Sequence, residues 1–315
     1  MSDYLHNHPE FQQLLRAVEH EKGIDSSLIE KDYWIMHVLY GLQQGSFYFE
    51  LKGGTSLSKG YGIIHRFSED IDIRIEPPVS IDVKVRRNHT KPAHRESRKQ
   101  YYDWLAKNIK IDGINKIIRD AEFDNETYFS GGIRLFYQSM FPDIEGLKDG
   151  VLLEVGFDDV TPNELVTVSS WALDFAQKKK VDAIDNKAYN VKCYHPGFTF
   201  VEKLQTIATK FRQHQETGKM PANFLRHYYD VACLLDNDIV QKFIGTQGYK
   251  EHKNKRFPSK EKNLPLSKQE AFLLNDSETR ELFEKEYKQT AALYYQGQIS
   301  LTNILDKLSK NLDRL

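Results

Sequence analysis

Cysteine and long apolar runs are both scarce in this chain. Only Cys193 and Cys233 occur among its 315 residues, and no CxxC pair is present. This argues against a disulfide framework or a structural zinc site and is typical of a reducing compartment. No stretch approaches the roughly 18 apolar residues that cross a membrane, and the polar, acidic N-terminus does not resemble a signal peptide. We therefore expect a cytoplasmic protein without membrane contact.

A charge excess and the common catalytic motifs are also missing. The formal net charge is -1, so any contact with nucleic acid must come from a local patch rather than from the whole molecule. The sequence contains no GxSxG, Walker A, GxGxxG or HExxH pattern, which leaves hydrolase, P-loop, dinucleotide and zinc-protease functions without support. A length of 315 residues favours two domains.

The most informative segment that is present ends in two aspartates, within DIDIRI at 70–75. Side chains alternate between the faces of a β-strand, so Asp70 and Asp72 are predicted to project together. Two buried carboxylates repel each other, and a bound divalent cation removes that penalty. Mg²⁺ prefers oxygen ligands and often shares its coordination shell with phosphates. The pair therefore predicts a metal site for nucleotide chemistry.

A glycine turn lies upstream of the aspartates. Gly53 and Gly54 allow the backbone to approach a ligand closely, and a helix that starts near Thr55 would direct free N–H groups at an anion. The turn is thus a candidate phosphate cradle.

Apolar periodicity divides the chain into an α/β part and a helical part. Ser26 and Ser27 are expected to cap the second helix, and no strand is expected after about 195. We predict domains at 1–195 and 196–315 and a polar, lysine-rich loop at 245–269. Strands are predicted at 47–52, 70–75, 133–139, 151–159 and 189–195, and helices at 9–22, 96–122, 198–214, 222–237, 277–296 and 299–313.

Residues 79–100 are rich in basic groups and allow two interpretations. One is a solvated loop that leads into a helix. The other is an arm that contacts phosphates, followed by aromatic residues that either stack on bases or pack in the core. The residues concerned are Arg86, Arg87, Lys91, Arg95, Arg98 and Lys99, followed by Tyr101, Tyr102 and Trp104.

The order of these motifs resembles a known family. An apolar residue, Gly-Gly-Thr, a helix and then Arg-x-Ser-x-Asp-x-Asp resemble the nucleotidyltransferases of the DNA polymerase β superfamily. More narrowly, GGTSLSK followed by RFSEDID resembles the AbiEii/AbiGii family of MenT-like toxins. The resemblance implies an α+β fold, in which a polymerase β-like domain with a mixed sheet flanked by helices precedes a C-terminal helical bundle.

The resemblance also implies a function. The expected enzyme uses Mg²⁺ (or Mn²⁺) to transfer NMP from an NTP to an acceptor hydroxyl, and in relatives the acceptor is often the 3′ end of tRNA. The expected context is a bacterial toxin–antitoxin or abortive-infection system with a cognate antitoxin. Transfer to a small molecule or a protein is one alternative, and a non-catalytic module that binds RNA or a partner is another.

A third metal carboxylate is expected to join Asp70 and Asp72 from a neighbouring strand. Glu154 matches the position at which polymerase β-like enzymes place a carboxylate, although aspartate is more usual there. Asp158 lies on the same predicted face four residues later, and strand alternation favours Glu154.

The motif also suggests nucleotide-binding residues around the aspartates. Gly53, Gly54 and Thr55 are expected to hold the triphosphate. Three further candidates have alternative readings: Ser68 as a phosphate ligand or a turn serine, Arg66 as a phosphate contact or a brace for the Asp pair, and Lys59 as a phosphate contact or a solvated lysine.

Two motifs of the helical part complete the expected site. VEKLQTIATK resembles the family helix whose lysine reaches the nucleotide phosphates, which implies that role for Lys203, with Lys210 a weaker candidate. RHYYDVACLL resembles the family's Arg-x-x-x-Asp helix, in which Asp230 orients Lys203 or the base and sugar. By spacing alone, Arg226 and Asp230 would form an intrahelical ion pair. The nucleotide is expected in a cleft between the domains.

Overall fold

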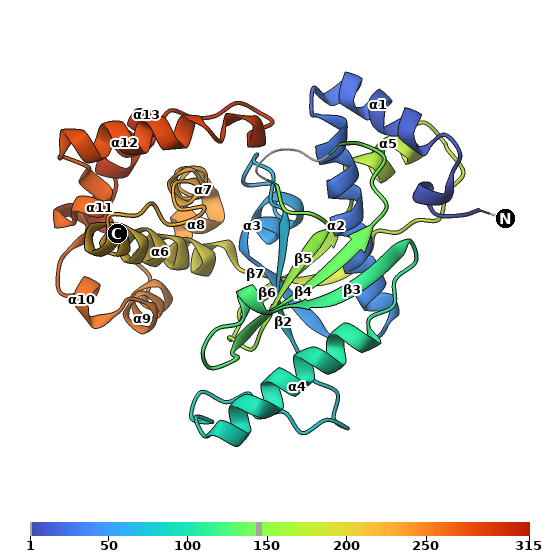
Figure 1. Cartoon of the computed structure of the whole chain (residues 1–315). Coiled ribbons are helices and arrows are strands. Elements are labelled where there is room, and N and C mark those ends of the chain that lie inside the picture. The colour runs from blue at the N-terminus through green and yellow to red at the C-terminus, as the bar shows by residue number, and fades with distance from the viewer. Residues whose placement is uncertain (1, 143–146) are drawn as a thin grey trace. The chain divides into compact units, whose positions relative to one another are not determined.

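The chain divides into two compact units. This computed structural model describes residues 2–142 and 147–315. The first unit comprises the chain up to Tyr61 together with Ser68–Tyr194, and the second comprises Gly62–Phe67 and His195–Leu315 (Figure 1). The sequence suggested a division near 195 but gave no sign that a short upstream segment joins the second unit.

A mixed sheet forms the centre of the first unit. In the described part of this unit, seven strands follow the order β3-β4-β5-β2-β1-β7-β6. The pairs β2–β5 and β1–β7 are parallel and the other neighbours are antiparallel. The strands are β1 (Phe49–Lys52), β2 (Asp70–Ile75), β3 (Ile114–Asp120), β4 (Ser130–Tyr137), β5 (Val151–Gly156), β6 (Asn163–Val168) and β7 (Ala188–Tyr194). The expected α+β class with a mixed sheet is confirmed.

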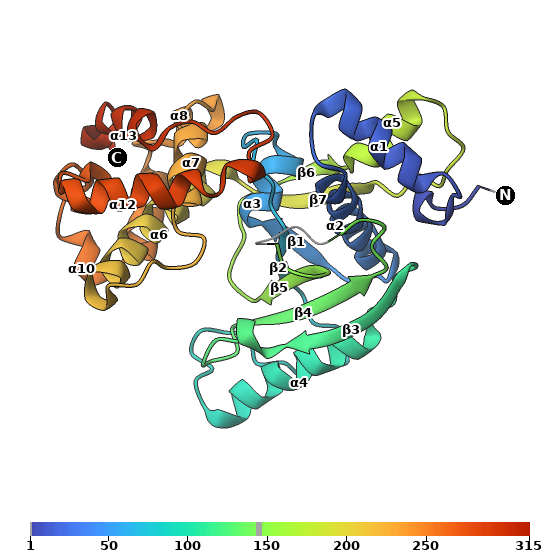
Figure 2. The same ribbon diagram turned by 45° about the horizontal axis from the view of Figure 1, so that its top comes forward.

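The central strand β2 has one apolar and one polar face. Ile71, Ile73 and Ile75 are fully buried on the apolar side. Helix α4 (Pro92–Asn108) contacts the neighbouring strands β3 and β4, and α2 (Ser26–Gln44) contacts β5 and β7. Figures 1 and 2 both show α4 lying along β3 and β4. The approach is close, because a Cβ atom on Gly131 of β4 would lie 2.7 Å from the ring of Tyr102 in α4. The apolar face thus fixes the sheet, and the opposite face carries the aspartates.

The helices of the first unit agree with the sequence patterns in part. Helix α1 (Phe11–Lys22) ends at Gly23, which has the left-handed conformation with φ 67°. Asp25, rather than Ser26 or Ser27, caps α2, because its carboxylate accepts a hydrogen bond from the Ser27 backbone N–H. The glycine turn forms α3 (Gly53–Thr55), which continues as a π-type turn over Ser56–Gly60.

One prediction for the first unit was wrong, and one further strand was missed. The helix expected at 96–122 ends at Asn108, and β3 follows. Gly113 lies between them with φ 74°, and Trp34 and His6 pack so closely that a side chain there would collide with both. Strand β6, which the sequence patterns did not predict, pairs with β7 in an antiparallel manner, and α5 (Trp171–Lys178) connects the two strands.

The second unit consists of helices and turns. Its residues 195–315 form no strand, and a single bridge pairs Arg66 with Tyr294. The helices are α6 (Pro196–Thr217), α7 (Arg226–Leu234), α8 (Asp238–Phe243), α9 (Gln247–Arg256), α10 (Ser259–Lys262), α11 (Glu270–Leu273), α12 (Ser277–Lys288) and α13 (Leu301–Ser309).

The lysine-rich stretch at 245–269 is largely helical, which corrects the predicted loop. Thr246 caps α9 by accepting a hydrogen bond from the Tyr249 backbone N–H. Tyr249 and His252 are buried along one side of the helix, which shows why a mostly charged sequence folds here. No helix in the described residues has the length and apolarity to cross a membrane.

Candidate active site

Three carboxylates share the polar face of the sheet. Asp72 lies opposite Lys52 of β1 on one side and opposite Glu154 of β5 on the other. Side chains directly opposite each other on one face have Cβ atoms about 5 Å apart. Asp70 lies on the same face two residues earlier and is almost fully buried. The register of β1, β2 and β5 therefore brings Asp70, Asp72 and Glu154 together.

The rival carboxylate Asp158 lies outside this group. Strand β5 ends at Gly156, so alternation no longer directs Asp158 to the same face. Its carboxylate forms an ion pair with Arg87, with an N–O distance of 3.2 Å, and its side chain is 42% exposed. The register thus favours Glu154.

The glycine turn packs against both aspartates. Gly53 has φ 72°, and a Cβ atom at this position would lie 2.1 Å from Oδ2 of Asp72. The fully buried Thr55 donates its hydroxyl proton to the backbone carbonyl of Asp70, at 2.6 Å. Thr55 therefore supports β2, whereas the sequence suggested that it binds the nucleotide. Gly54 is also buried.

Lys59 forms a nearly inaccessible ion pair, which contradicts the alternative of a solvated lysine, while a phosphate contact stays a prediction. Its ammonium lies 2.8 Å from Asp32 and 4.4 Å from the centre of the Trp171 ring. Asp32 also accepts a hydrogen bond from the Trp171 backbone N–H at 2.8 Å, and the Lys59 and Asp32 side chains are nearly inaccessible. Lys59 thus ties the glycine turn to α2 and α5.

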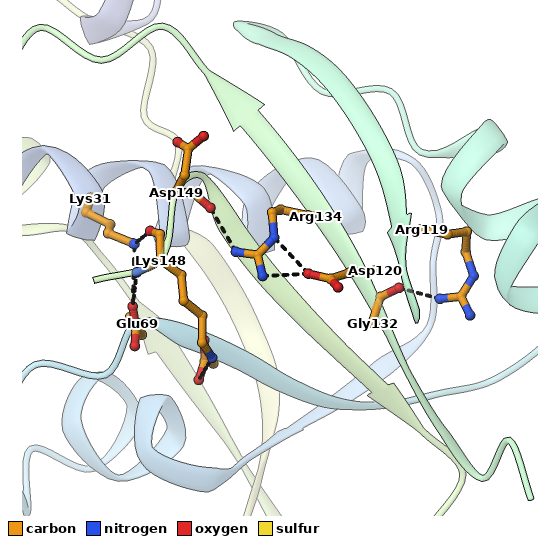
Figure 3. Close-up of polar contacts among 9 residues, drawn as sticks. Lys31, Glu69, Arg119, Asp120, Gly132, Arg134, Lys148 and Asp149 are labelled. Atoms are coloured by element: carbon orange, nitrogen blue, oxygen red, sulfur yellow. Dashed lines mark hydrogen bonds and ion pairs between the residues drawn. The ribbon is translucent and has the colours of Figure 1, made fainter. Parts of the chain in front are cut away.

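A lysine that sequence reasoning missed sits on the first aspartate. Lys148 donates to both carboxylate oxygens of Asp70 at 3.1 Å, and its ammonium lies 4.7 Å from the centre of the Phe123 ring. Its backbone N–H donates to Glu69 at 3.0 Å, and its carbonyl accepts from Lys31 (Figure 3). The sequence around Lys148 has an ordinary composition, so no local signal marks it.

An arginine neutralises a further acid near this face. Asp120 of β3 lies opposite Gly132, which in turn lies opposite Glu154. Arg134 contacts Asp120 through Nε and Nη2 and donates to the Asp149 carbonyl at 2.9 Å (Figure 3). Asp120 is therefore held by a two-point ion pair.

The donor set has the chemistry that a hard cation requires, although its geometry here is not that of a closed metal site. Within residues 2–142 and 147–315, no three His, Cys, Asp or Glu side chains converge as metal ligands. Asp70, Asp72 and Glu154 supply only oxygen atoms, as Mg²⁺ prefers. A cationic group, the Lys148 ammonium, already contacts Asp70.

The second unit contains a buried carboxylate of its own. Asp230 of α7 is fully buried, and Arg66 binds it through two hydrogen bonds of 2.7 Å. Lys203 of α6 lies 3.0 Å from the same carboxylate. Burial alone would raise the pKa of Asp230, but Arg66 and Lys203 hold this pKa well below its usual range. Asp230 is therefore ionised between two cations.

Lys203 has a second neighbour in this cluster. Its ammonium lies 3.3 Å from Nδ1 of His227. Burial, together with the charge of Lys203, lowers the pKa of His227 well below its usual value, so a neutral ring can accept this contact. Burial also lowers the pKa of Lys203, and the Asp230 carboxylate opposes that effect.

Arg66 acts in this cluster as a structural partner. Besides its two bonds to Asp230, it donates to the Phe67 carbonyl at 3.1 Å. The sequence suggested instead a phosphate contact or a brace for Asp70 and Asp72. Both oxygens of Asp230 are engaged by Arg66 and Lys203, which lie outside α7.

The fold and the carboxylate face define a nucleotidyltransferase. A family model described as "Nucleotidyl transferase AbiEii toxin, Type IV TA system" matches residues 37–307. The chain belongs to this family and is a nucleotidyltransferase toxin of a type IV toxin–antitoxin system.

A solved structure supports the fold. MenT4, a nucleotidyltransferase toxin from Mycobacterium tuberculosis H37Rv, superposes with a TM-score of 0.58 at 15% sequence identity, covering 96% of this chain and 88% of that one. A search of curated proteins found no match.

Loss of Arg66 should destabilise the second unit strongly. Arg66→Met leaves the buried Asp230 with Lys203 as its remaining cationic partner, and breaking a buried ion pair costs about 3–5 kcal/mol. Arg280→Met removes a half-exposed pair with Glu284 and should cost less than about 1 kcal/mol. Urea unfolding followed by far-UV circular dichroism, with hydrogen exchange of α6 and α7, measures both changes. Equal effects of the two substitutions would contradict this assignment.

The same cluster predicts a pH dependence. Because folding lowers the pKa of Asp230, its contribution to stability is complete above the usual value of 3.8 and is lost as the pH falls toward the folded-state pKa. Between pH 5 and pH 3, the free energy of unfolding should therefore fall more in the wild type than in Asp230→Asn. Parallel losses in both proteins would show that other groups govern acid unfolding.

Substitution of Gly53 should displace Asp72. An alanine with positive φ costs about 1–2 kcal/mol, and Gly53→Ala adds a collision with the carboxylate. Gly23→Ala is the matched control, since Gly23 has a similar φ of 67° and open space around it. Both variants should lose stability, but only Gly53→Ala should lose nucleotidyl transfer, by about 100-fold or more. Retained activity in Gly53→Ala would mean that Asp72 tolerates the shift.

Proposed function

We propose that this toxin transfers NMP from an NTP to the 3′-terminal hydroxyl of tRNA in a Mg²⁺-dependent reaction. The acceptor oxygen attacks the α-phosphorus, and pyrophosphate leaves. The observation that carries the proposal is the register that aligns Asp70, Asp72 and Glu154 on one face of the sheet. Family membership supports the antitoxin partner and the NTP substrate.

In this proposal the three carboxylates hold the divalent cation. The metal would neutralise charge on the phosphoryl group that is transferred. Gly53 brings the backbone against Asp72 and leaves no side chain between the turn and a ligand. Gly54 and Ser68 are proposed to contact the triphosphate, whereas Thr55 keeps β2 in place.

Lys203 is the proposed phosphate ligand of the second unit. A lysine is a compact point charge with rotatable donors, which suits a phosphate. Asp230 and His227 restrict its ammonium, and Arg66 fixes Asp230, so the lysine needs little ordering when substrate binds. Asp230 and Arg66 are thus proposed as positioning residues.

A transfer assay tests the chemistry and the choice of third carboxylate. Protein is incubated with Mg²⁺, total bacterial tRNA and each α-³²P-labelled NTP in turn. Wild type should label RNA, and Asp70→Ala/Asp72→Ala should not. Glu154→Gln should lose at least about 100-fold in rate, whereas Asp158→Asn, which changes an exposed ion pair, should stay close to wild type.

Other outcomes would redirect the proposal. Label in a small molecule or in protein would replace RNA as the acceptor. Absence of label with every NTP, together with no NTP or Mg²⁺ binding by calorimetry, would exclude the enzymatic role of this site.

The proposed metal site also predicts competition with Lys148. Removing the ammonium from Asp70 in Lys148→Met should tighten Mn²⁺ binding without nucleotide by roughly tenfold, because the direct attraction of a few kcal/mol is partly offset by solvation. Lys116→Met is the control, since Lys116 also lies over a phenylalanine ring, Phe136. Electron paramagnetic resonance of free Mn²⁺ measures the affinity. Unchanged binding in Lys148→Met would argue against a metal at Asp70.

A further inference from the structure

A strongly basic segment of the first unit takes no part in the site described so far. We call residues 84–99 the basic arm. It contains seven Lys or Arg residues and one acid, Glu96, although the whole chain has a net charge of -1. The arm begins in the loop after β2 and ends within α4.

Arg98 gives this segment a fixed shape. Its side chain is fully buried. It donates to the carbonyl of Lys84 at 2.6 Å and to that of His89 at 3.2 Å, and two further bonds of 2.9 and 2.6 Å reach the carbonyl of Thr127. The guanidinium lies 4.2 Å from the centre of the Phe129 ring. One buried arginine therefore fastens the loop to the body of the first unit, so the arm is a built surface.

Four of the remaining basic groups are exposed and form no ion pair within the part of the chain that the structure describes: Arg86, Lys91, Arg95 and Lys99. Lys91, Arg95 and Lys99 are exposed and follow one another at intervals of four residues, which places them in a row along α4. Arg86 is exposed in the preceding loop. Like charges four residues apart destabilise a helix by a few tenths of a kcal/mol per pair. A surface that only needed solvation would mix both signs, so the row favours a polyanionic partner.

The arm is attached close to the carboxylates. Arg87 contacts Asp158 at 3.2 Å, and Asp158 follows Glu154 by four residues. Four residues span at most about 14 Å of chain. A polyanion at the carboxylate face is therefore within range of Arg87, and one that extends around the sheet to its apolar face, which α4 covers, can reach Lys91, Arg95 and Lys99.

The chemistry of the exposed residues selects among polyanions. A segment that binds a membrane surface combines basic groups with exposed large apolar side chains. The exposed positions of the basic arm carry none. Phosphates spaced along a nucleic-acid strand match a row of separate cations.

We infer that the basic arm binds the phosphate backbone of the acceptor RNA. The inference rests on the proposed function, because it assumes that the acceptor is RNA. Contacts of this kind position the RNA and carry no sequence information. The arm thus contributes affinity and orientation, and selection of the terminal hydroxyl falls to the carboxylate face.

The test compares two sets of three neutralised residues. Arg86→Gln/Arg95→Gln/Lys99→Gln removes exposed charges of the arm. Lys107→Gln/Lys110→Gln/Lys116→Gln removes the same number of exposed charges around the opposite end of α4. All six positions are exposed, so both variants should keep the wild-type melting curve, as circular dichroism can verify. Fluorescence anisotropy with labelled tRNA measures the affinity over a range of salt concentrations.

The arm variant should bind tRNA at least about tenfold more weakly, and its slope of log K against log salt should fall by roughly 2–3, since each lost phosphate contact removes about 0.7–0.9. The control variant should keep the wild-type slope. Calorimetric affinity for NTP should be the same in all three proteins, while transfer of label to tRNA should fall only in the arm variant.

Two results would overturn the inference, and they can be told apart. If wild type labels tRNA and the arm variant matches the control in slope and in rate, the arm is not the RNA surface, and the proposed function stands. If wild type neither binds nor labels RNA, the RNA acceptor itself is wrong, and the inference fails with it.

Discussion

The concentration of negative charge on one face of the central strands is the constraint on which the first unit depends. Asp70, Asp72 and Glu154 lie side by side because β2 pairs with β5 in a fixed register, and that register is locked by the isoleucines on the opposite face. A shift by one residue would move the acids to the apolar face and the isoleucines to the polar face. Hydrophobic burial therefore holds together groups that repel each other. The surroundings offset the repulsion, through Lys148 on Asp70 and through Arg134 on the nearby Asp120.

The second unit also contains a buried negative charge, but direct ion pairs stabilise it. A single buried carboxylate, Asp230, is matched by a bidentate arginine and a lysine, which together keep it ionised. Arg66 comes from the segment Gly62–Phe67, which separates the glycine turn from β2 in sequence but belongs to the second unit. The residues of the motif RFSEDID therefore belong to two different units. Its arginine is part of the ion cluster of the second unit, and its aspartates are part of the carboxylate face of the first. A substitution at Arg66 is thus a change in the second unit, even though it lies four residues from Asp70.

The sequence predicted what short-range patterns determine. The bounds of β2 follow from strict alternation in DIDIRI, and the family and the α+β class follow from motif order. Ion-pair partners that are distant in sequence produce no short-range pattern from which they could be predicted. Lys148 is 78 residues from Asp70, and Asp230 is 164 residues from Arg66. Edge strand β3 escaped prediction because none of its residues is fully buried, and the lysine-rich helix α9 because its polar residues obscure the two that are buried.

Motif residues need not touch the ligand that the motif is associated with. Thr55 and Lys59 follow the glycine turn directly, yet one donates to the backbone of β2 and the other to a buried aspartate. Thr55 fixes the turn against the strand that carries the carboxylates, and Lys59 fixes it against α2 and α5. Gly53 works by having no side chain, since any Cβ atom would occupy the space of the Asp72 carboxylate. The glycine–threonine–lysine signature therefore encodes the distance between a backbone turn and an acidic strand. A ligand that binds between the turn and the strand depends on that distance. Substitutions in the motif that keep polarity but alter packing are therefore expected to reduce activity as much as loss of a charged group.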